Sequence, residues 1–160
     1  MEAVGTNVCC FLFVISFLFI TIEVNCQVQL GANINGEAAD NALGYSVSIS
    51  ESGSFIATGA IFNDDTGTDA GQLRIYQFVN NNWTQTGSDI MGEGTSDFFG
   101  WSVAISANGT RVAASARDND GNGTNSGHVR VFERSGNTWI QLGADIDGEA
   151  AFDESGYSIA

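Results

Sequence analysis

The sequence has no proline and no lysine, and it contains a single histidine, His128. A lone histidine excludes sites built from paired histidines, and no nucleophile–base pair or phosphate-binding glycine loop accompanies it. The cysteines Cys9, Cys10 and Cys26 all precede residue 27, so the chain beyond them holds no disulfide and no cysteine-ligated metal. We therefore expect a protein that is not an enzyme, with His128 as an exposed strand residue.

Positive charge is also scarce. The five basic residues are all arginine, against 19 acidic residues, and the formal net charge is −14. Nucleic-acid binding needs a basic stripe that neutralises phosphates, so this charge balance excludes it. Such acidity fits a solubilising surface or sites for divalent cations.

The amino terminus carries one unbroken apolar run at residues 8–22. At about 15 residues it is shorter than the roughly 20 that span a bilayer as a helix. We expect residues 1–26 to be a signal peptide, with Gln27 as the mature start and a secreted or cell-surface protein as the result. No Lys or Arg precedes the run, so an uncleaved signal anchor is the alternative. Membrane association would need that anchor, or a C-terminal one in a longer protein.

An internal repeat dominates the rest of the chain. Three related segments begin at Gly31, Gly87 and Gly143, and their spacings are 87 − 31 = 56 and 143 − 87 = 56. They align without a gap, which indicates internal duplication. Other residues keep the same offset: Gly44, Gly100 and Gly156, each followed by an aromatic residue and Ser; Gly71 and Gly127; Arg74 and Arg130; Trp83 and Trp139.

Each repeat contains four strand-length apolar runs, which in the second copy are 101–106, 111–116, 128–133 and 138–142. The first two look buried on both faces, as the inner strands of a blade are. Four antiparallel strands per repeat are typical of a β-propeller blade. A β-solenoid is the alternative, but its rungs recur at about half this period. The sequence predicts an all-β β-propeller built from four-stranded antiparallel blades with a 56-residue repeat.

The register of the repeat divides the chain after residue 26. Residues 28–43 match a fourth strand and the loop after it, residues 44–99 and 100–155 are two whole blades, and residues 156–160 begin another. Two blades do not close a ring of four to eight. We expect residues 27–160 to be part of a longer propeller, with a ring of several copies as the alternative.

The segment Phe99-Gly-Trp-Ser-Val-Ala is followed by an apolar strand that ends at Ser115-Ala116, or at Gly59-Ala60 in the first copy. This pattern resembles FG-GAP repeats, and the resemblance covers residues 28–160. It implies the kind of propeller found at the head of integrin α-subunits and in many secreted proteins. It also implies an extracellular adhesion or interaction role.

The loops after the second and fourth strands are long and acidic, whereas the others are tight turns. Binding residues favour long loops on a rigid scaffold, so the acidic loops are the candidate site for a protein or glycan partner. Asp118, Asp120 and Asn122 reproduce the first half of a calcium loop. Val129 stands where the bidentate Glu is needed. An Asx-rich solvated turn is the alternative to a calcium site, and no other cofactor is expected.

Three sequons, at Asn82, Asn108 and Asn122, predict a glycoprotein if the host glycosylates. The leading functional hypothesis is an extracellular binding or adhesion module that recognises a protein or glycan. The alternatives are a non-catalytic part of a secreted hydrolase or lyase, and a structural surface repeat protein. Fold alone does not decide among these functions.

Overall fold

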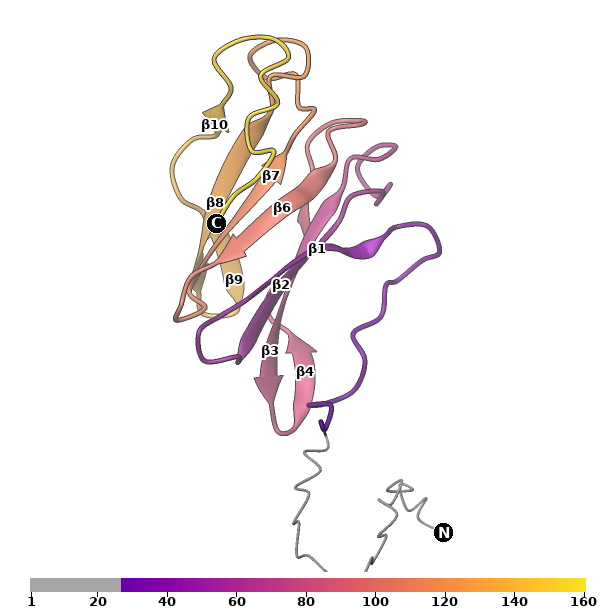
Figure 1. Ribbon diagram of the computed structural model, residues 1–160, viewed down its shortest axis with the longest axis vertical. Helices are drawn as coiled ribbons and strands as arrows, with labels where there is room; N and C mark the ends of the chain where they lie inside the picture. The colour runs from indigo at the N-terminus through magenta and orange to yellow at the C-terminus, as the bar shows by residue number, and fades with distance from the viewer. Residues whose placement is uncertain (1–26) are drawn as a thin grey trace, which may run out of the picture.

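The computed structural model describes residues 27–160, which form two antiparallel β-sheets lying side by side (Figure 1). The first sheet contains β1 (Leu43–Ile49), β2 (Phe55–Ala60), β3 (Gln72–Val79), β4 (Asn82–Gln85) and β5 (Ile90–Met91). The second contains β6 (Phe99–Ile105), β7 (Arg111–Ala116), β8 (His128–Ser135), β9 (Thr138–Gln141) and β10 (Ile146–Asp147). Residues 27–160 include no helix, and so none that could span a membrane. The predicted signal peptide, residues 1–26, lies outside the described residues.

Each sheet is one copy of the repeat, and the prediction of an all-β fold is confirmed. The first four strands of a copy pair in chain order in the first sheet, β1-β2-β3-β4. The expected fourth strand, residues 138–142 in the second copy, is present as β9. A short fifth strand that the sequence does not predict follows it, because β4 and β5 both pair with β3, as β9 and β10 both pair with β8. Gly87 lies between β4 and β5 with a positive φ of 79°, a conformation that glycine adopts without steric cost. The described residues form two blade-like sheets and no closed ring.

The two sheets approach closely at glycine positions. A Cβ on Gly59 of β2 would lie 2.0 Å from the carbonyl oxygen of Gly100 in β6. Gly100 itself has a φ of +89° and lies where the β6–β7 register shifts. Only glycine allows backbones this close, so these residues set the spacing between the sheets.

The core lies between the sheets. The first sheet contributes small and branched side chains, and the second contributes the larger ones and more alanine. Residues of this cluster are less than a tenth exposed: Ala57, Leu73, Ile75, Phe99, Val103, Val112, Ala114, Ala116 and Phe132. Because its members come from both sheets, neither sheet buries its apolar face without the other.

The expectation that the first strand of each copy is buried on both faces is wrong for β1. Tyr45, Val47 and Ile49 are 47%, 59% and 58% exposed, whereas Val103, which replaces Val47 in β6, is 7% exposed. The two strands differ in which of their faces a neighbouring sheet covers. β6 packs on β1 and β2, but within residues 27–160 no sheet covers the other face of β1.

The segments at residues 27–42 and 156–160 contain no strand, although the repeat register holds there. Trp83 Nε1 donates a hydrogen bond to Leu30 O at 3.0 Å, and Trp139 Nε1 donates to Thr86 O at 2.8 Å. The tryptophan of each copy therefore packs on the segment one repeat earlier. The assignment of residues 28–43 to a fourth strand and the loop after it stays a prediction.

Replacing Gly59 with Ala tests the close approach. The added Cβ would meet Gly100 O, so we expect the free energy of unfolding to fall by at least about 2 kcal/mol in urea denaturation. The control is Gly36→Ala, whose Cβ would have its nearest neighbour at 3.5 Å, with an expected change within about 0.5 kcal/mol. Equal unfolding midpoints for the two variants would contradict the packing described.

Candidate functional site

The long connections gather at one end of the two sheets and the tight turns at the other (Figure 1). The long-loop face is defined here as residues 36–42, 61–71, 92–98, 117–127 and 147–155. Arg117 is its only basic residue. Its acidic residues are Glu37, Asp40, Asp64, Asp65, Asp69, Glu93, Asp97, Asp118, Asp120, Asp147, Glu149, Asp153 and Glu154. Most of the negative charge of the chain therefore lies on this face.

Backbone hydrogen bonds hold the long-loop face together. The connection 92–98 between the sheets bonds to loop 61–71 of the first copy and to loop 117–127 of the second. Asp97, only 6% exposed, accepts a hydrogen bond from Asn119 Nδ2 at 2.8 Å. The same backbone bonds recur in both copies: Gly92 N to Gly71 O, Gly148 N to Gly127 O, Ser96 N to Thr68 O, and Phe152 N to Thr124 O, all at 2.8 Å. The loops of this face are consequently braced, meaning that backbone hydrogen bonds join each connection to its neighbours, and the face continues from one sheet to the next.

The residues of the predicted calcium loop are already engaged within the protein. Arg117 donates two hydrogen bonds to the Asp118 carboxylate, at 2.8 and 3.2 Å. Asp120 Oδ1 accepts from Asn125 N at 2.8 Å, and Asn122 Nδ2 donates to Gly148 O at 2.8 Å. The hydrogen bond to Asp118 also raises the pKa of Arg117. Calcium binding at Asp118, Asp120 and Asn122 stays untested, and these contacts favour the alternative of an Asx-rich turn.

A cluster of charged side chains lies beside the third strand of each sheet. In the first sheet, Arg74 is buried and donates to both carboxylate oxygens of Asp89, at 2.9 and 2.8 Å, and it also forms an ion pair with Glu37. Burial lowers the pKa of Arg74, but the hydrogen bonds to Asp89 and Glu37 raise it overall. Burial raises the pKa of Asp89, but Arg74 and Gln85 lower it overall. Arg74 is therefore held between two carboxylates, and the three side chains carry a formal charge of −1.

In the second sheet the corresponding cluster contains His128, and the expectation that this residue is exposed is wrong. His128 is 1% exposed because it begins β8, where it pairs with Ala116 of β7 on one side and Asp147 of β10 on the other. Burial lowers the pKa of His128, opposed in part by Asp145, so the imidazole is neutral at pH 7. Sequence reasoning missed this cluster. The signal available was the shared offset of Arg74 and Arg130.

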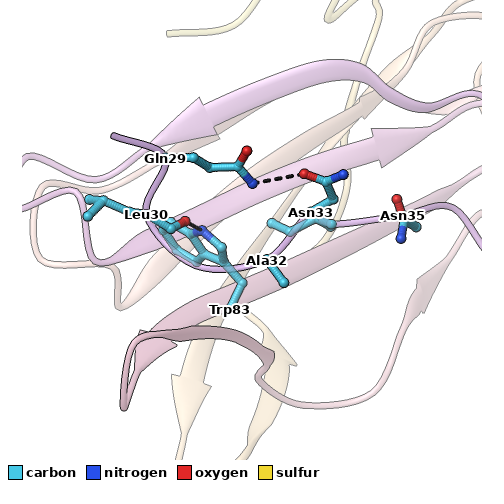
Figure 2. Close-up of a pocket in the computed structure, with 7 residues that line it drawn as sticks. Gln29, Leu30, Ala32, Asn33, Asn35 and Trp83 are labelled. Atoms are coloured by element: carbon cyan, nitrogen blue, oxygen red, sulfur yellow. Dashed lines mark hydrogen bonds between the residues drawn. The ribbon is translucent and has the colours of Figure 1, made fainter. Parts of the chain in front are cut away.

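An open hollow lies between the segment 29–35 and Trp83 (Figure 2). Gln29 donates to Asn33 Oδ1 at 2.8 Å across its rim. Trp139 fills the same position of the repeat, where it packs against Gly87. The hollow is therefore part of the packing between one repeat and the segment before it, and we do not assign it a ligand.

The three sequon asparagines are exposed but differ in their surroundings. Asn82 begins β4, and Asn108 lies in the β6–β7 turn, where its Oδ1 accepts from Thr110 N at 3.1 Å. Asn122 uses its Nδ2, the atom that would carry a glycan, to bond Gly148 O. Glycosylation at these positions stays a prediction.

The fold defines an all-β repeat protein whose units are blade-like antiparallel sheets. Residues 91–132 match the family model of the FG-GAP repeat. The match starts in β5 and ends in β8, so it contains the connection 92–98 and loop 117–127. The chain thus contains an FG-GAP repeat, as its sequence pattern predicts. Such repeats indicate a β-propeller-type module and are typical of extracellular or cell-surface proteins. No curated protein matches the chain.

Replacing Arg74, the buried arginine of the first charged cluster, tests how much its ion pair with Asp89 stabilises the fold. Arg74→Leu leaves the Asp89 carboxylate without its ion-pair partner, and we expect it to reduce the free energy of unfolding by about 3 kcal/mol at pH 7. The control Arg111→Leu breaks an exposed pair with Glu133 and should cost under about 1 kcal/mol.

The cost of Arg74→Leu should shrink in acid. Because the folded-state pKa of Asp89 is depressed, its contribution is complete above the ordinary pKa of 3.8 and is lost as the pH falls through the lower folded value. Equal losses for the Arg74 and Arg111 variants in urea denaturation at pH 7 would contradict this account.

Calorimetric titration with calcium tests the loop at residues 118–122. We expect no saturable heat at millimolar calcium, because Arg117 already neutralises Asp118 and Asp120 caps a backbone amide. Saturable binding that disappears in Asp120→Asn, but persists in the opposite-end control Glu51→Gln, would establish a calcium site instead.

Proposed function

We propose that the chain is part of an extracellular β-propeller that binds a protein or a glycan through its long-loop face. The observation that carries this proposal is the bracing of that face. The connection 92–98 bonds to the long loops of both copies, so the backbone positions that carry acidic side chains from successive repeats are held relative to one another. Residues that bind are commonly placed on loops positioned by a rigid scaffold.

The chemistry of the face favours two classes of partner. Exposed carboxylates such as Asp65 and Glu149 accept hydrogen bonds from sugar hydroxyls, and they pair with the Arg and Lys side chains of a basic protein surface. The net charge of −14 attracts cationic partners over distance and repels nucleic acid. Location outside the cell is supported by the apolar run at residues 8–22 and by the usual setting of FG-GAP repeats.

We also propose that residues 27–160 are not catalytic. The single histidine is buried beside carboxylates, and Arg74, Arg117 and Arg130 are each held by acidic side chains. Within the described residues, a group poised to abstract a proton from a substrate would have to come from the exposed carboxylates. Those lie on an open face that does not exclude water.

Binding to a glycan array and to a panel of purified extracellular proteins tests the proposal. The loop variant Asp65→Asn/Glu149→Gln removes two charges from the long-loop face, and we expect at least a tenfold weaker affinity for whichever partner binds the wild-type chain. The control Glu51→Gln/Glu133→Gln removes two charges near the opposite end and should bind within twofold of wild type. Equal affinities for both variants, or no partner on either platform, would contradict the proposal.

A further inference from the structure

The two charged clusters are built from the same positions, 56 residues apart, and they differ in one side chain. The first contains Glu37, Gln72, Arg74, Gln85 and Asp89, and the second contains Glu93, His128, Arg130, Gln141 and Asp145. Four of the five residue types are identical. The glutamine at position 72 becomes the histidine at position 128, so the first cluster serves as an internal reference for what that histidine changes.

The arginine and the aspartate separate in the second cluster. Arg74 contacts Asp89 at 2.9 and 2.8 Å, but Arg130 Nε lies 4.0 Å from Asp145 Oδ1. Arg130 instead donates to Gln141 Oε1 and to Met91 O, each at 3.0 Å. Its guanidinium also lies over two aromatic rings of the core, those of Phe99 and Phe132. Arg130 therefore pairs with Asp145 only at 4.0 Å and with Glu93 at 3.6 Å, and Asp145 accepts a hydrogen bond from Gln141 Nε2 at 2.6 Å.

His128 is buried without the hydrogen bonds that a buried imidazole normally makes. Gln72 Nε2 donates to Asp89 Oδ2 at 2.8 Å, whereas His128 Nδ1 lies 3.7 Å from Asp145 Oδ2, beyond hydrogen-bond distance. Its other ring nitrogen, Nε2, has no partner at all. An unsatisfied buried polar atom is unfavourable, and a bound ion is one way to satisfy it.

Glu93, His128 and Asp145 each bring one potential ligand atom to the same place. One atom each from Glu93, His128 and Asp145 lies within 4.8 Å of the other two. Ligands of a tetrahedral zinc ion lie about 3.4 Å apart, given metal–ligand distances near 2.1 Å. The remaining contraction has to come from Glu93, whose side chain is 48% exposed and pairs with Arg130 Nη1 at 3.6 Å, so binding the ion requires Glu93 to turn from Arg130 toward His128. His128 is buried at the start of β8.

We propose that Glu93, His128 and Asp145 bind one divalent transition-metal ion of the zinc class. An imidazole and two carboxylates form a ligand set that such ions accept, with a fourth position left for water. Two carboxylates and one guanidinium give the empty cluster a formal charge of −1, so a divalent cation is attracted to it. This site is separate from the calcium-like loop at residues 118–122 and goes beyond the function proposed above.

Cobalt and zinc titrations of the full chain test the site. The protein is purified without a histidine tag, and Cys9, Cys10 and Cys26 are replaced by serine in every sample because thiolates bind the same ions. Cobalt(II) should develop the visible absorption of a tetrahedral site with one equivalent bound, and zinc should displace it. Because His128 is the only histidine, its ring proton signals should shift on zinc addition and report the ligand directly.

Two variants distinguish this site from adventitious binding. His128→Gln copies the first repeat and so should fold, which circular dichroism checks, and we expect zinc affinity to fall at least tenfold. Glu93→Gln alters an exposed side chain, and we expect its zinc affinity to fall by a similar factor. Asp65→Asn, elsewhere on the long-loop face, should bind zinc as wild type does. No cobalt spectrum in the wild type, or unchanged affinity in both cluster variants, would overturn the proposal. Neither result bears on protein or glycan binding at the long-loop face.

Discussion

The close approach of Gly59 and Gly100 sets the geometry on which the other features depend. With no Cβ on either residue, the backbone of β2 lies against that of β6, and Ser46 Oγ donates to Gly100 O at 2.6 Å across the same boundary. The small side chains of β2 and β7 belong to the same arrangement, because bulkier ones would hold the sheets apart. Each sheet then buries its apolar face only by packing against the next.

Fixing the sheets at this distance also fixes the loops between them. The connection 92–98 has to pass from one sheet to the other within a few residues, and it takes left-handed backbone at Ser96 and Phe98 to do so. The equivalent residues Asp40, Ala42, Phe152 and Glu154 do the same in the neighbouring connections. Because the same turn recurs at the same offset in all three connections, the backbone of the long-loop face is a property of the repeat.

Repetition explains what the sequence could predict. A spacing of 56 residues, alternating apolar runs and glycines at constant offsets are local signals, and they predict the strands, their antiparallel order and the long-loop end. The features that depend on distant neighbours could not be predicted. The exposure of β1 depends on whether another sheet covers it, and the burial of His128 depends on β10, a strand that the sequence pattern does not reveal.

In the candidate site, too, local features could be predicted from the sequence and contacts between distant residues could not. The composition of the loops predicts their acidity. The sequence also suggests that Asp118 is free to bind calcium, but in the structure its carboxylate accepts a hydrogen bond from Arg117. The opposite holds for Glu93, His128 and Asp145, which are far apart in the chain and share no motif. A difference between two copies of one repeat identifies them, since Gln72 shows what His128 has replaced.

Amide hydrogen exchange in the folded chain tests most directly whether blade packing braces the long-loop face. We predict that the amides of Gly92, Ser96, Gly148 and Phe152, which bond across connections, exchange as slowly as those of β2 and β7. Exchange at these amides as fast as in the exposed turn at Glu51 and Ser52 would contradict the account, because the acidic residues would then have no fixed arrangement to offer a partner.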